Sequence, residues 1–350
     1  MHHEQLPIAI TPGDPCGIGP ETIARAWREQ VALTRRCFVA GDVGVMRRAM
    51  ALIAGVTPSP VVQIDAPGEA LTVPPNCLPV LQVVAPAPEL PWGVVDARAG
   101  RLAGECVLWA TRAALAGEVA AIVTAPLHKE ALHAAGLPWS QYPGHTELLQ
   151  AESARQAGVP LAQMPVRMML ANEELRTVLV SIHVSLRDAL NAITPDQVMQ
   201  TLQITHHALR RLLGRPPRMA VAGVNPHAGE GGLFGREEIE VLQPVIARAR
   251  DLGLDVHGPL APDTVFMRAR HAPGHPGEFD VVVAMYHDQG LIPVKYLGVE
   301  QGVNVTLGLP LIRTSPDHGT AFDRAGQGRA DASSLIQALR MARRLAGLPG

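Results

Sequence analysis

Three histidines follow short apolar runs that are typical of buried strands. His183 ends the run VLVSIH, His227 ends VAGVNPH, and His287 follows VVVAMY. Because ligands in parallel α/β sheets bind just beyond the carboxyl ends of the strands, a site is expected at these positions. Neutral imidazoles suit a divalent ion, and three of them leave coordination positions for substrate oxygens. The three histidines are far apart in the sequence, so only the fold or a dimer contact can bring them together. The competing interpretation is therefore that each histidine is an ordinary polar residue at a strand end.

A second group of residues forms candidate anion sites. The segment YPGHTE (142–147) opens a predicted helix, so unpaired backbone N–H groups, His145 and the Thr146 hydroxyl favour a phosphate or carboxylate. Alternatively, Thr146 is only the N-cap of the helix. Lys295 and Arg313 lie in the apolar surroundings IPVKYL and LPLIRTS. A buried cation needs a partner, which is either an anionic substrate or a structural salt bridge.

Two glycine-rich turns are candidates for holding a ligand. GDPCGIGPE (13–21) follows a predicted strand and opens a predicted helix, with Pro20 suited to the first helical turn. It either cradles part of a ligand or is a tight turn. GEGGLFG (229–235) has the spacing GxGxxxG, which departs from the dinucleotide fingerprint GxGxxG, so an ordinary Rossmann site is not predicted.

The composition limits the class of protein. The 350 residues are 47% hydrophobic and 18% charged, with 30 Lys and Arg against 32 Asp and Glu, which argues against disorder and against a nucleic-acid partner. No apolar run approaches the ~20 residues of a membrane span, and the start MHHEQ lacks the pattern of a signal peptide, so a cytoplasmic protein without a membrane partner is expected. The four cysteines form no CxxC pair and are expected to be reduced and mostly buried.

Short apolar runs alternate with segments of helical period, which predicts an α/β fold of parallel strands joined by helical crossovers. The predicted strands are 8–11, 37–40, 121–124, 167–170, 178–183, 219–224, 281–285 and 303–307. The predicted helices are 21–29, 43–54, 97–116 with Gly117 as a stop, 146–157, 195–213, 237–252 and 334–346. The Pro-rich segment 56–91 is interpreted as surface connections with one strand. The middle of the chain, 127–259, is predicted to form one domain, and 1–126 with 260–350 to form the other.

Six motifs, in order, resemble those of the 4-hydroxythreonine-4-phosphate dehydrogenase family of pyridoxal phosphate biosynthesis and its D-threonate and D-erythronate 4-phosphate dehydrogenase paralogues. They are ITPGDPCGIGPE, TAPLHK, GHTE, VNPHAGEGG, MYHDQG and TSPDHGTA, and the likeness runs from Ile8 almost to the C-terminus. The resemblance implies a fold similar to isocitrate and isopropylmalate dehydrogenases, with two α/β/α domains around a cleft and a homodimer with shared active sites. The domain of 1–126 and 260–350 would lie on the cofactor side, and 127–259 would carry the dimer interface.

The resemblance also implies roles for individual residues. The family's metal ligands match His183, His227 and His287, with at least one of them given across the dimer. Its substrate contacts match His145, Thr146, Lys295, Asn304 and Arg313. The loop that holds the adenosine half of NAD in the related dehydrogenases looks like HGTAFD, with His318, Gly319, Thr320 and Asp323.

The implied reaction is an oxidative decarboxylation that uses NAD, or alternatively NADP, and one divalent ion, either Zn, Mg, Co or Mn. 4-Phosphohydroxy-L-threonine would give 3-amino-2-oxopropyl phosphate. Two further residues are expected at the reacting centre: Lys295 acts as a proton relay or as an electrostatic clamp, and Asp288 orients His287 or contacts substrate.

Three alternatives remain open at this point. Tyr142 and Pro143, with the segment 150–164, partly resemble the sugar-acid paralogues, so D-threonate or D-erythronate 4-phosphate is an alternative substrate. A dihydrodiol carboxylate is disfavoured because the dihydrodiol branch loses the Gly-His-Thr motif that the chain keeps at 144–146. A non-catalytic protein that binds NAD or phosphate is disfavoured because all three histidines and both cations are present.

Overall fold

A computed structural model describes residues 6–53 and 59–348, and the chain divides into two compact units. One unit consists of Met1–Pro165 and Leu309–Gly350, and the other of Val166–Gly308. The expectations that rest on residues 1–5, on Ala54 and on 56–58 lie outside the described residues.

These boundaries differ from the predicted division at 127–259. The segment 127–165 packs in the first unit because its helices α5 (Lys129–Ala134) and α6 (His145–Ala157) contact α4 (Ala97–Leu115). Residues 260–308 belong to the second unit because the strands they contain pair within its sheet.

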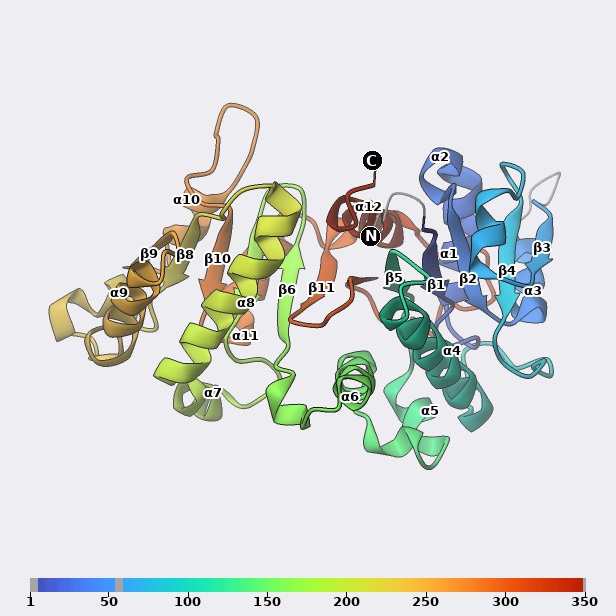
Figure 1. The fold of residues 1–350 in the computed structure, drawn as a ribbon, viewed down its shortest axis with the longest axis horizontal. Helices are drawn as coiled ribbons and strands as arrows, with labels where there is room; N and C mark the ends of the chain where they lie inside the picture. Colours follow the sequence, from blue (N-terminus) through green and yellow to red (C-terminus); the bar gives the residue numbers. More distant parts are fainter. Residues whose placement is uncertain (1–5, 54–58, 349–350) are drawn as a thin grey trace. The chain divides into compact units, whose positions relative to one another are not determined.

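The sheet of the first unit is entirely parallel. Its strand order is β3 (Val61–Ile64), β4 (Leu78–Gln82), β2 (Cys37–Gly41), β1 (Ile8–Thr11), β5 (Ala121–Thr124) and β12 (Arg313–Pro316). Figure 1 shows α4 crossing the strands, and it contacts β1, β2 and β5, with α5 and α6 beside it. A second helical layer contains α1 (Gly19–Glu29), α2 (Val31–Thr34), α3 (Val43–Ile53) and α12 (Ser333–Leu345). The short 3-10 helices are Pro67–Leu71, Trp139–Gln141 and Leu161–Gln163.

The core of the first unit forms where β strands meet α4. Phe38 of β2 and Ile122 of β5, the two strands that flank β1, pack in one cluster with Val107 and Ala110 of α4, and all four are fully buried. Because both faces of the sheet are covered, its central strands β1, β2 and β5 are buried at every position, which is why they are continuous apolar runs in the sequence.

The sheet of the second unit is mixed. Its strand order is β11 (Val303–Leu307), β6 (Arg167–Ala171), β7 (Arg176–Leu179), β10 (Val281–Ala284), β8 (Met219–Ala222) and β9 (Val256–Leu260). The helices α8 (Pro195–Leu213) and α9 (Gln243–Asp251) lie on one face of this sheet. Apolar residues of α10 (Val265–Ala269) and α11 (His287–Tyr296) pack with the strands in a hydrophobic core on the other face. The remaining elements are α7 (Leu186–Ala192), the 3-10 turns Pro226–Gly232 and Val299–Gln301, and the π-helical turn Glu238–Leu242.

The α/β class is confirmed, with two corrections to the arrangement of strands. The sequence predicted parallel strands throughout, but β6 runs antiparallel to both β7 and β11 because the tight connection between β6 and β7 leaves no room for a crossover helix. The segment 56–91 contains two strands, β3 and β4, rather than one. At the edge of the sheet, β3 is only partly buried, so its apolar pattern is weak.

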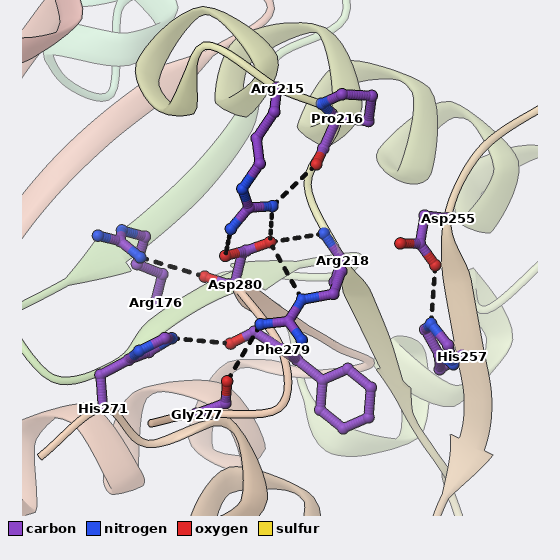
Figure 2. Close-up of polar contacts among 10 residues, drawn as sticks. All are labelled: Arg176, Arg215, Pro216, Arg218, Asp255, His257, His271, Gly277, Phe279 and Asp280. Atoms are coloured by element: carbon purple, nitrogen blue, oxygen red, sulfur yellow. Dashed lines mark hydrogen bonds and ion pairs between the residues drawn. The ribbon is translucent and has the colours of Figure 1, made fainter. Parts of the chain in front are cut away.

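An ion-pair network closes the amino end of β10 (Figure 2). The Asp280 carboxylate accepts hydrogen bonds from Arg215 at 2.7 and 2.8 Å and from the backbone N–H of Arg218 at 2.7 Å. Arg176 also donates to the carbonyl oxygen of Asp280, at 3.3 Å. Burial raises the pKa of the Asp280 carboxyl, but the bonds from Arg215 and Arg218 outweigh this, so the pKa lies below its usual value. The network therefore ties β7, β8 and β10 together at the ends of the strands opposite the histidines.

The four cysteines are free thiols, and three of them are buried. Burial raises the pKa of the Cys16 thiol to about 12, so it stays protonated at neutral pH. No helix in the described ranges is long and apolar enough to span a membrane.

Candidate functional site

The three histidines singled out in the sequence follow three neighbouring strands of the second unit. β10 lies between β7 and β8 and is parallel to both, so their carboxyl ends meet at one edge of the sheet. His183 follows β7, His227 follows β8, and His287 begins α11 directly after β10. The predicted strand at 178–183 ends at Leu179, which leaves His183 in the connection to α7 rather than in the strand.

Two of the histidines lie side by side. The ring centroids of His183 and His287 are 5.6 Å apart, with the ring planes inclined at 46°. Nδ1 of His287 lies 2.7 Å from Oδ1 of Asp288, which directs Nε2 of His287 away from the carboxylate. This is the arrangement by which a carboxylate fixes the tautomer of a metal-binding histidine.

The third histidine lies in a turn of left-handed backbone. His227 has φ 53° and ψ 28°, its side chain is exposed, and its ring lies 6.2 Å from that of Phe234. Within the described ranges 6–53 and 59–348, no three His, Cys, Asp or Glu side chains are grouped closely enough to hold one metal ion. The structure of one chain thus brings together His183 and His287 and leaves His227 outside the pair.

The donor set fits a divalent ion. Metal–nitrogen bonds of about 2 Å allow two imidazoles at the observed separation to share one ion. Both rings are accessible, since the His287 side chain is 39% exposed and His183 is exposed. Two imidazoles and a carboxylate behind one of them suit Zn, Co or Mn, with substrate oxygens or a further imidazole completing the coordination.

Lys295 and Asn304 also belong to the second unit, and Lys295 corrects an expectation. Its apolar neighbours predicted a buried cation, but Lys295 lies exposed on α11, because Leu291 and Val294 form the buried face of that helix. Asn304 is half-buried on β11, opposite Leu170 of β6. Of the residues proposed for catalysis, Asp288 adjoins the histidine pair and Lys295 lies two turns further along the same helix.

The first unit contains a candidate anion site at the start of α6. Gly144 occupies the N-cap of the 13-residue helix, so Thr146 lies in the first turn and is not the N-cap. Nε2 of His145 is buried and has no hydrogen-bond partner among the described residues. Backbone N–H groups at a helix start and an unpaired buried imidazole nitrogen together suit an anion that brings its own acceptors.

Arg313 supplies positive charge at this site. It is buried, and its guanidinium donates to the Thr124 hydroxyl at 2.7 and 3.1 Å. Burial lowers the pKa of Arg313 to about 10, partly offset by Glu147, so the group stays charged at neutral pH. Burial, with the charges of Arg313 and Lys129, holds the pKa of His145 well below its usual value, so its imidazole is neutral.

A second set of loops in the first unit surrounds HGTAFD (318–323). The N–H of Ile18 donates to the carbonyl oxygen of Thr320 at 3.0 Å, and a Cβ added to Gly17 would lie 2.8 Å from that oxygen. The His128 ring stacks on Phe322 with centroids 4.5 Å apart. These contacts fix the loop against the turn that follows β1, which explains why that turn is rich in glycine.

Other members of this loop remain available to a ligand. Nε2 of His318 is buried without a hydrogen-bond partner in the part of the chain that the structure describes. Asp323 and Gly319 are exposed, and Thr320 is partly exposed. A loop of this kind presents backbone N–H groups, an imidazole and a carboxylate to one ligand.

The sequence did not assign roles to Thr124, Lys129 and His128. All three lie in the motif TAPLHK, directly after β5 or at its end. The position of the motif at a strand end was the signal available, but only the structure shows that Thr124 contacts Arg313 and that His128 stacks on Phe322.

The fold and these sites define a two-unit α/β protein with a histidine pair suited to a metal ion and a buried group of residues suited to an anion. A sequence model described as "Pyridoxal phosphate biosynthetic protein PdxA" matches residues 33–342, and the chain belongs to this family. The family resemblance seen in the sequence motifs is confirmed.

Individual relatives match over almost their whole length. The chain is 50% identical over 341 residues to 4-hydroxythreonine-4-phosphate dehydrogenase of Beijerinckia indica, covering 97% of this chain and 95% of the relative. It is 44% identical over 342 residues to D-threonate 4-phosphate dehydrogenase of Pectobacterium atrosepticum, covering 97% and 99%. The crystal structure of 4-hydroxythreonine-4-phosphate dehydrogenase from Klebsiella pneumoniae is similar with a TM-score of 0.83 and 44% identity, covering 97% and 99%.

Proposed function

We propose that the chain is an NAD-dependent and divalent-metal-dependent dehydrogenase that oxidises and decarboxylates 4-phosphohydroxy-L-threonine to 3-amino-2-oxopropyl phosphate. The observation that carries the proposal is the buried pair of His145 and Arg313 at the α6 N-terminus, where the Arg313 charge acts on the unpaired imidazole; together they suit a phosphate group. Relatives at 50% and 44% identity are named for substrates that both end in a 4-phosphate.

Each group of residues has a role in this reaction. Arg313 and neutral His145 bind the phosphate, with Thr146 in the same helical turn. His183, His227 and His287 hold a divalent ion, which supplies positive charge for the negative charge that develops on the substrate oxygens during oxidation and decarboxylation. Asp288 orients His287, and Lys295 moves a proton or neutralises charge.

The loop 318–323 would bind the adenosine half of NAD. His318 and the exposed backbone at Gly319 and Thr320 offer polar groups, and the exposed carboxylate of Asp323 suits the ribose hydroxyls. A carboxylate in that position disfavours the 2′-phosphate of NADP through like-charge repulsion. The unit that carries this loop is therefore proposed as the cofactor side.

A homodimer with shared active sites is part of the proposal. The three histidines do not form one group in a single chain. Exposed apolar side chains also lie on both elements that carry the histidine pair: Val184, Leu186 and Leu190 after His183, and Ile292 and Tyr296 on α11. Burying this surface against a second copy would remove apolar area from water and let a partner chain supply the missing ligand.

D-Threonate or D-erythronate 4-phosphate is the second candidate substrate, because relatives named for D-threonate 4-phosphate match 97% and 98% of the chain at 44% identity. The same anion site and histidines serve either substrate, and the difference lies in the group beside the carboxylate. The amino group of one substrate is replaced by a hydroxyl in the other.

The deciding experiment measures NADH formation by the full chain loaded in turn with Zn, Mg, Co or Mn. The substrates are 4-phosphohydroxy-L-threonine, D-threonate 4-phosphate and D-erythronate 4-phosphate. A kcat/KM at least ~100-fold higher for the amino substrate, about 2.7 kcal/mol, supports the proposal. The reverse ranking supports the second candidate. Turnover of only a cis-dihydrodiol carboxylate, or of none of these compounds, contradicts both, and chelator-treated protein is the control for the metal.

A further inference from the structure

The turn that carries His227 has an unusual backbone. Six successive residues, 227–232, have positive φ, with values of 53°, 53°, 81°, 43°, 65° and 100°. This conformation is unfavourable for residues with a Cβ, and three of the six are not glycine. Such a segment persists only where its surroundings hold it in place, and it is found most often at functional sites.

One buried carboxyl group holds the start of this turn. Glu238 is 1% exposed and lies at the beginning of the π-helical turn Glu238–Leu242. Its Oε1 accepts the backbone N–H groups of Val224 and Asn225 at 2.7 and 2.8 Å, and its Oε2 accepts the side-chain N–H of Asn225 at 2.9 Å. Three hydrogen bonds thus fix the two residues that lead into Pro226 and His227.

The turn is packed against the same carboxyl group. A Cβ added to Gly229 would lie 2.7 Å from Oε2 of Glu238, at a φ of +81° that disfavours a side chain. A Cβ added to Gly223 would lie 2.9 Å from Cα of Ala228 and 3.1 Å from Oε1 of Glu238. The left-handed turn therefore folds closely around Glu238, and a displacement of the carboxyl group moves the backbone that carries His227.

We propose that Glu238 is a positioning residue for His227, acting through the backbone of this turn to set the imidazole for a divalent ion. The inference rests on the metal-binding role of His227 in the proposed function. The role of Glu238 differs from that of Asp288, which contacts the ring of His287 directly. Glu238 does not reach the imidazole, and it acts instead on the chain that presents it.

The test is the substitution Glu238→Gln in the full chain. The amide keeps the size of the side chain, but its NH2 group meets the NH2 group of Asn225. Rotation of the Asn225 amide would let its Oδ1 accept from this NH2 group, but it would also turn Oδ1 toward Oε2 of Glu237, which now accepts the Asn225 N–H at 2.6 Å, so one bond is lost in either orientation. Glu240→Gln is the matched control, since Glu240 lies in the same π-helical turn, is exposed, and pairs with Arg236 at the surface.

Two quantities are measured besides activity: the Co²⁺ dissociation constant, from the visible absorption of bound Co²⁺, and the hydrogen exchange of residues 224–235 without metal. Glu238→Gln is expected to weaken Co²⁺ binding by about 10- to 100-fold and to speed exchange in the turn. The control is expected to stay within about twofold of the parent chain in both. In a His227→Ala background, Glu238→Gln is expected to cause no further loss of Co²⁺ affinity, because its effect passes through that histidine.

Three results would overturn the inference. The first is a folded Glu238→Gln chain with parental Co²⁺ affinity, and the second is a loss that simply adds to that of His227→Ala. The third is a parent chain that binds no Co²⁺, which contradicts the metal role in the proposed function as well, so the two failures are distinguishable. If circular dichroism shows that Glu238→Gln does not fold, Asn225→Ala is held to the same outcomes: it removes the side-chain N–H bonds to Glu238 and Glu237 and keeps both backbone N–H bonds to Glu238.

Discussion

The rings of His183 and His287 lie 5.6 Å apart because strand pairing continues beyond the ends of β7 and β10. The two strands are in register with Ala284 opposite Leu179. The N–H groups of Val180 and Ser181 then donate to the carbonyl oxygens of Ala284 and Met285 at 2.9 and 3.2 Å. The backbone therefore sets the separation of the two imidazoles before any ion binds.

Removal of either ring of this pair is expected to abolish metal-dependent turnover. In His287→Ala, a direct ligand is lost, so kcat/KM should fall by more than the roughly 10- to 100-fold typical of a group that acts behind a ligand. The measurement is NADH formation together with Co²⁺ titration. His257→Ala is the control, because His257 is exposed in the same unit, pairs with Asp255 and packs beside Phe279 rather than beside the histidine pair. Equal activity of the two variants would remove His287 from the site.

The Gly17→Ala substitution is expected to weaken NAD binding selectively. The new Cβ would lie 2.8 Å from the carbonyl oxygen of Thr320 and 3.0 Å from its Cβ, so the loop 318–323 must shift. We expect KM for NAD to rise about tenfold, roughly 1.4 kcal/mol, with KM for the phosphorylated substrate little changed. Gly68→Ala is the matched control, since no atom lies within 4 Å of its added Cβ. An unchanged KM for NAD in Gly17→Ala would separate this loop from the cofactor.

The edge of the sheet that carries the histidines could be predicted from the sequence. Continuous apolar runs such as 281–284 identify strands buried on both faces, and a polar residue after such a run marks the carboxyl end. The reasoning fails where a strand has no apolar pattern. β12, with the sequence RTSP, is buried by its neighbours although its own residues are mostly polar, and β9 contains Gly258 and Pro259.

The side-chain environment was less predictable than the strands. Arg313 and Lys295 have similar apolar neighbours in the sequence, but one is buried in a sheet and the other is exposed on a helix. The difference arises from the two elements, because β12 is buried at every position and α11 is buried on one face only. Likewise, the sequence around His227 does not indicate that the Glu238 side chain binds the residues before it. That contact depends on how the π-helical turn Glu238–Leu242 orients Glu238.

The neutral state of His145 predicts a specific dependence of stability on pH. Its pKa is lower in the folded protein than in the unfolded chain, so the unfolded chain binds more protons just below the ordinary value of 6.5. Stability should therefore fall as the pH drops below about 6.5. We expect His145→Gln to lose less stability than the parent between pH 7.5 and 5.5 in urea unfolding. His133→Gln, at an exposed position in the same unit, should follow the parent, and a parallel response of all three proteins would contradict the burial argument.

Disruption of the Asp280 network by Arg215→Ala is expected to lower the stability of the fold and to leave metal binding unchanged. Arg215→Ala leaves a buried carboxylate with only the Arg218 N–H at 2.7 Å and the more distant Arg218 guanidinium, 3.9 Å away. Because the Arg215 side chain is itself 49% exposed, we expect a loss of about 1–3 kcal/mol at pH 7 rather than the larger value of a fully buried pair.

The same variant separates this network from the histidine edge. The pKa of Asp280 is lower in the folded protein, so its ion pairs stabilise the fold above the ordinary pKa of 3.8 and lose this effect as the pH falls through the folded pKa. The difference in the free energy of unfolding between the parent and Arg215→Ala should therefore become smaller at acid pH. Co²⁺ affinity should stay parental, since the network lies at the amino ends of β8 and β10 and the histidines lie beyond their carboxyl ends. Arg236→Ala, which breaks a pair exposed on both sides, is the control and should change stability by no more than about 0.5 kcal/mol. If Arg215→Ala were as stable as Arg236→Ala, Asp280 would have to be held by Arg218 alone.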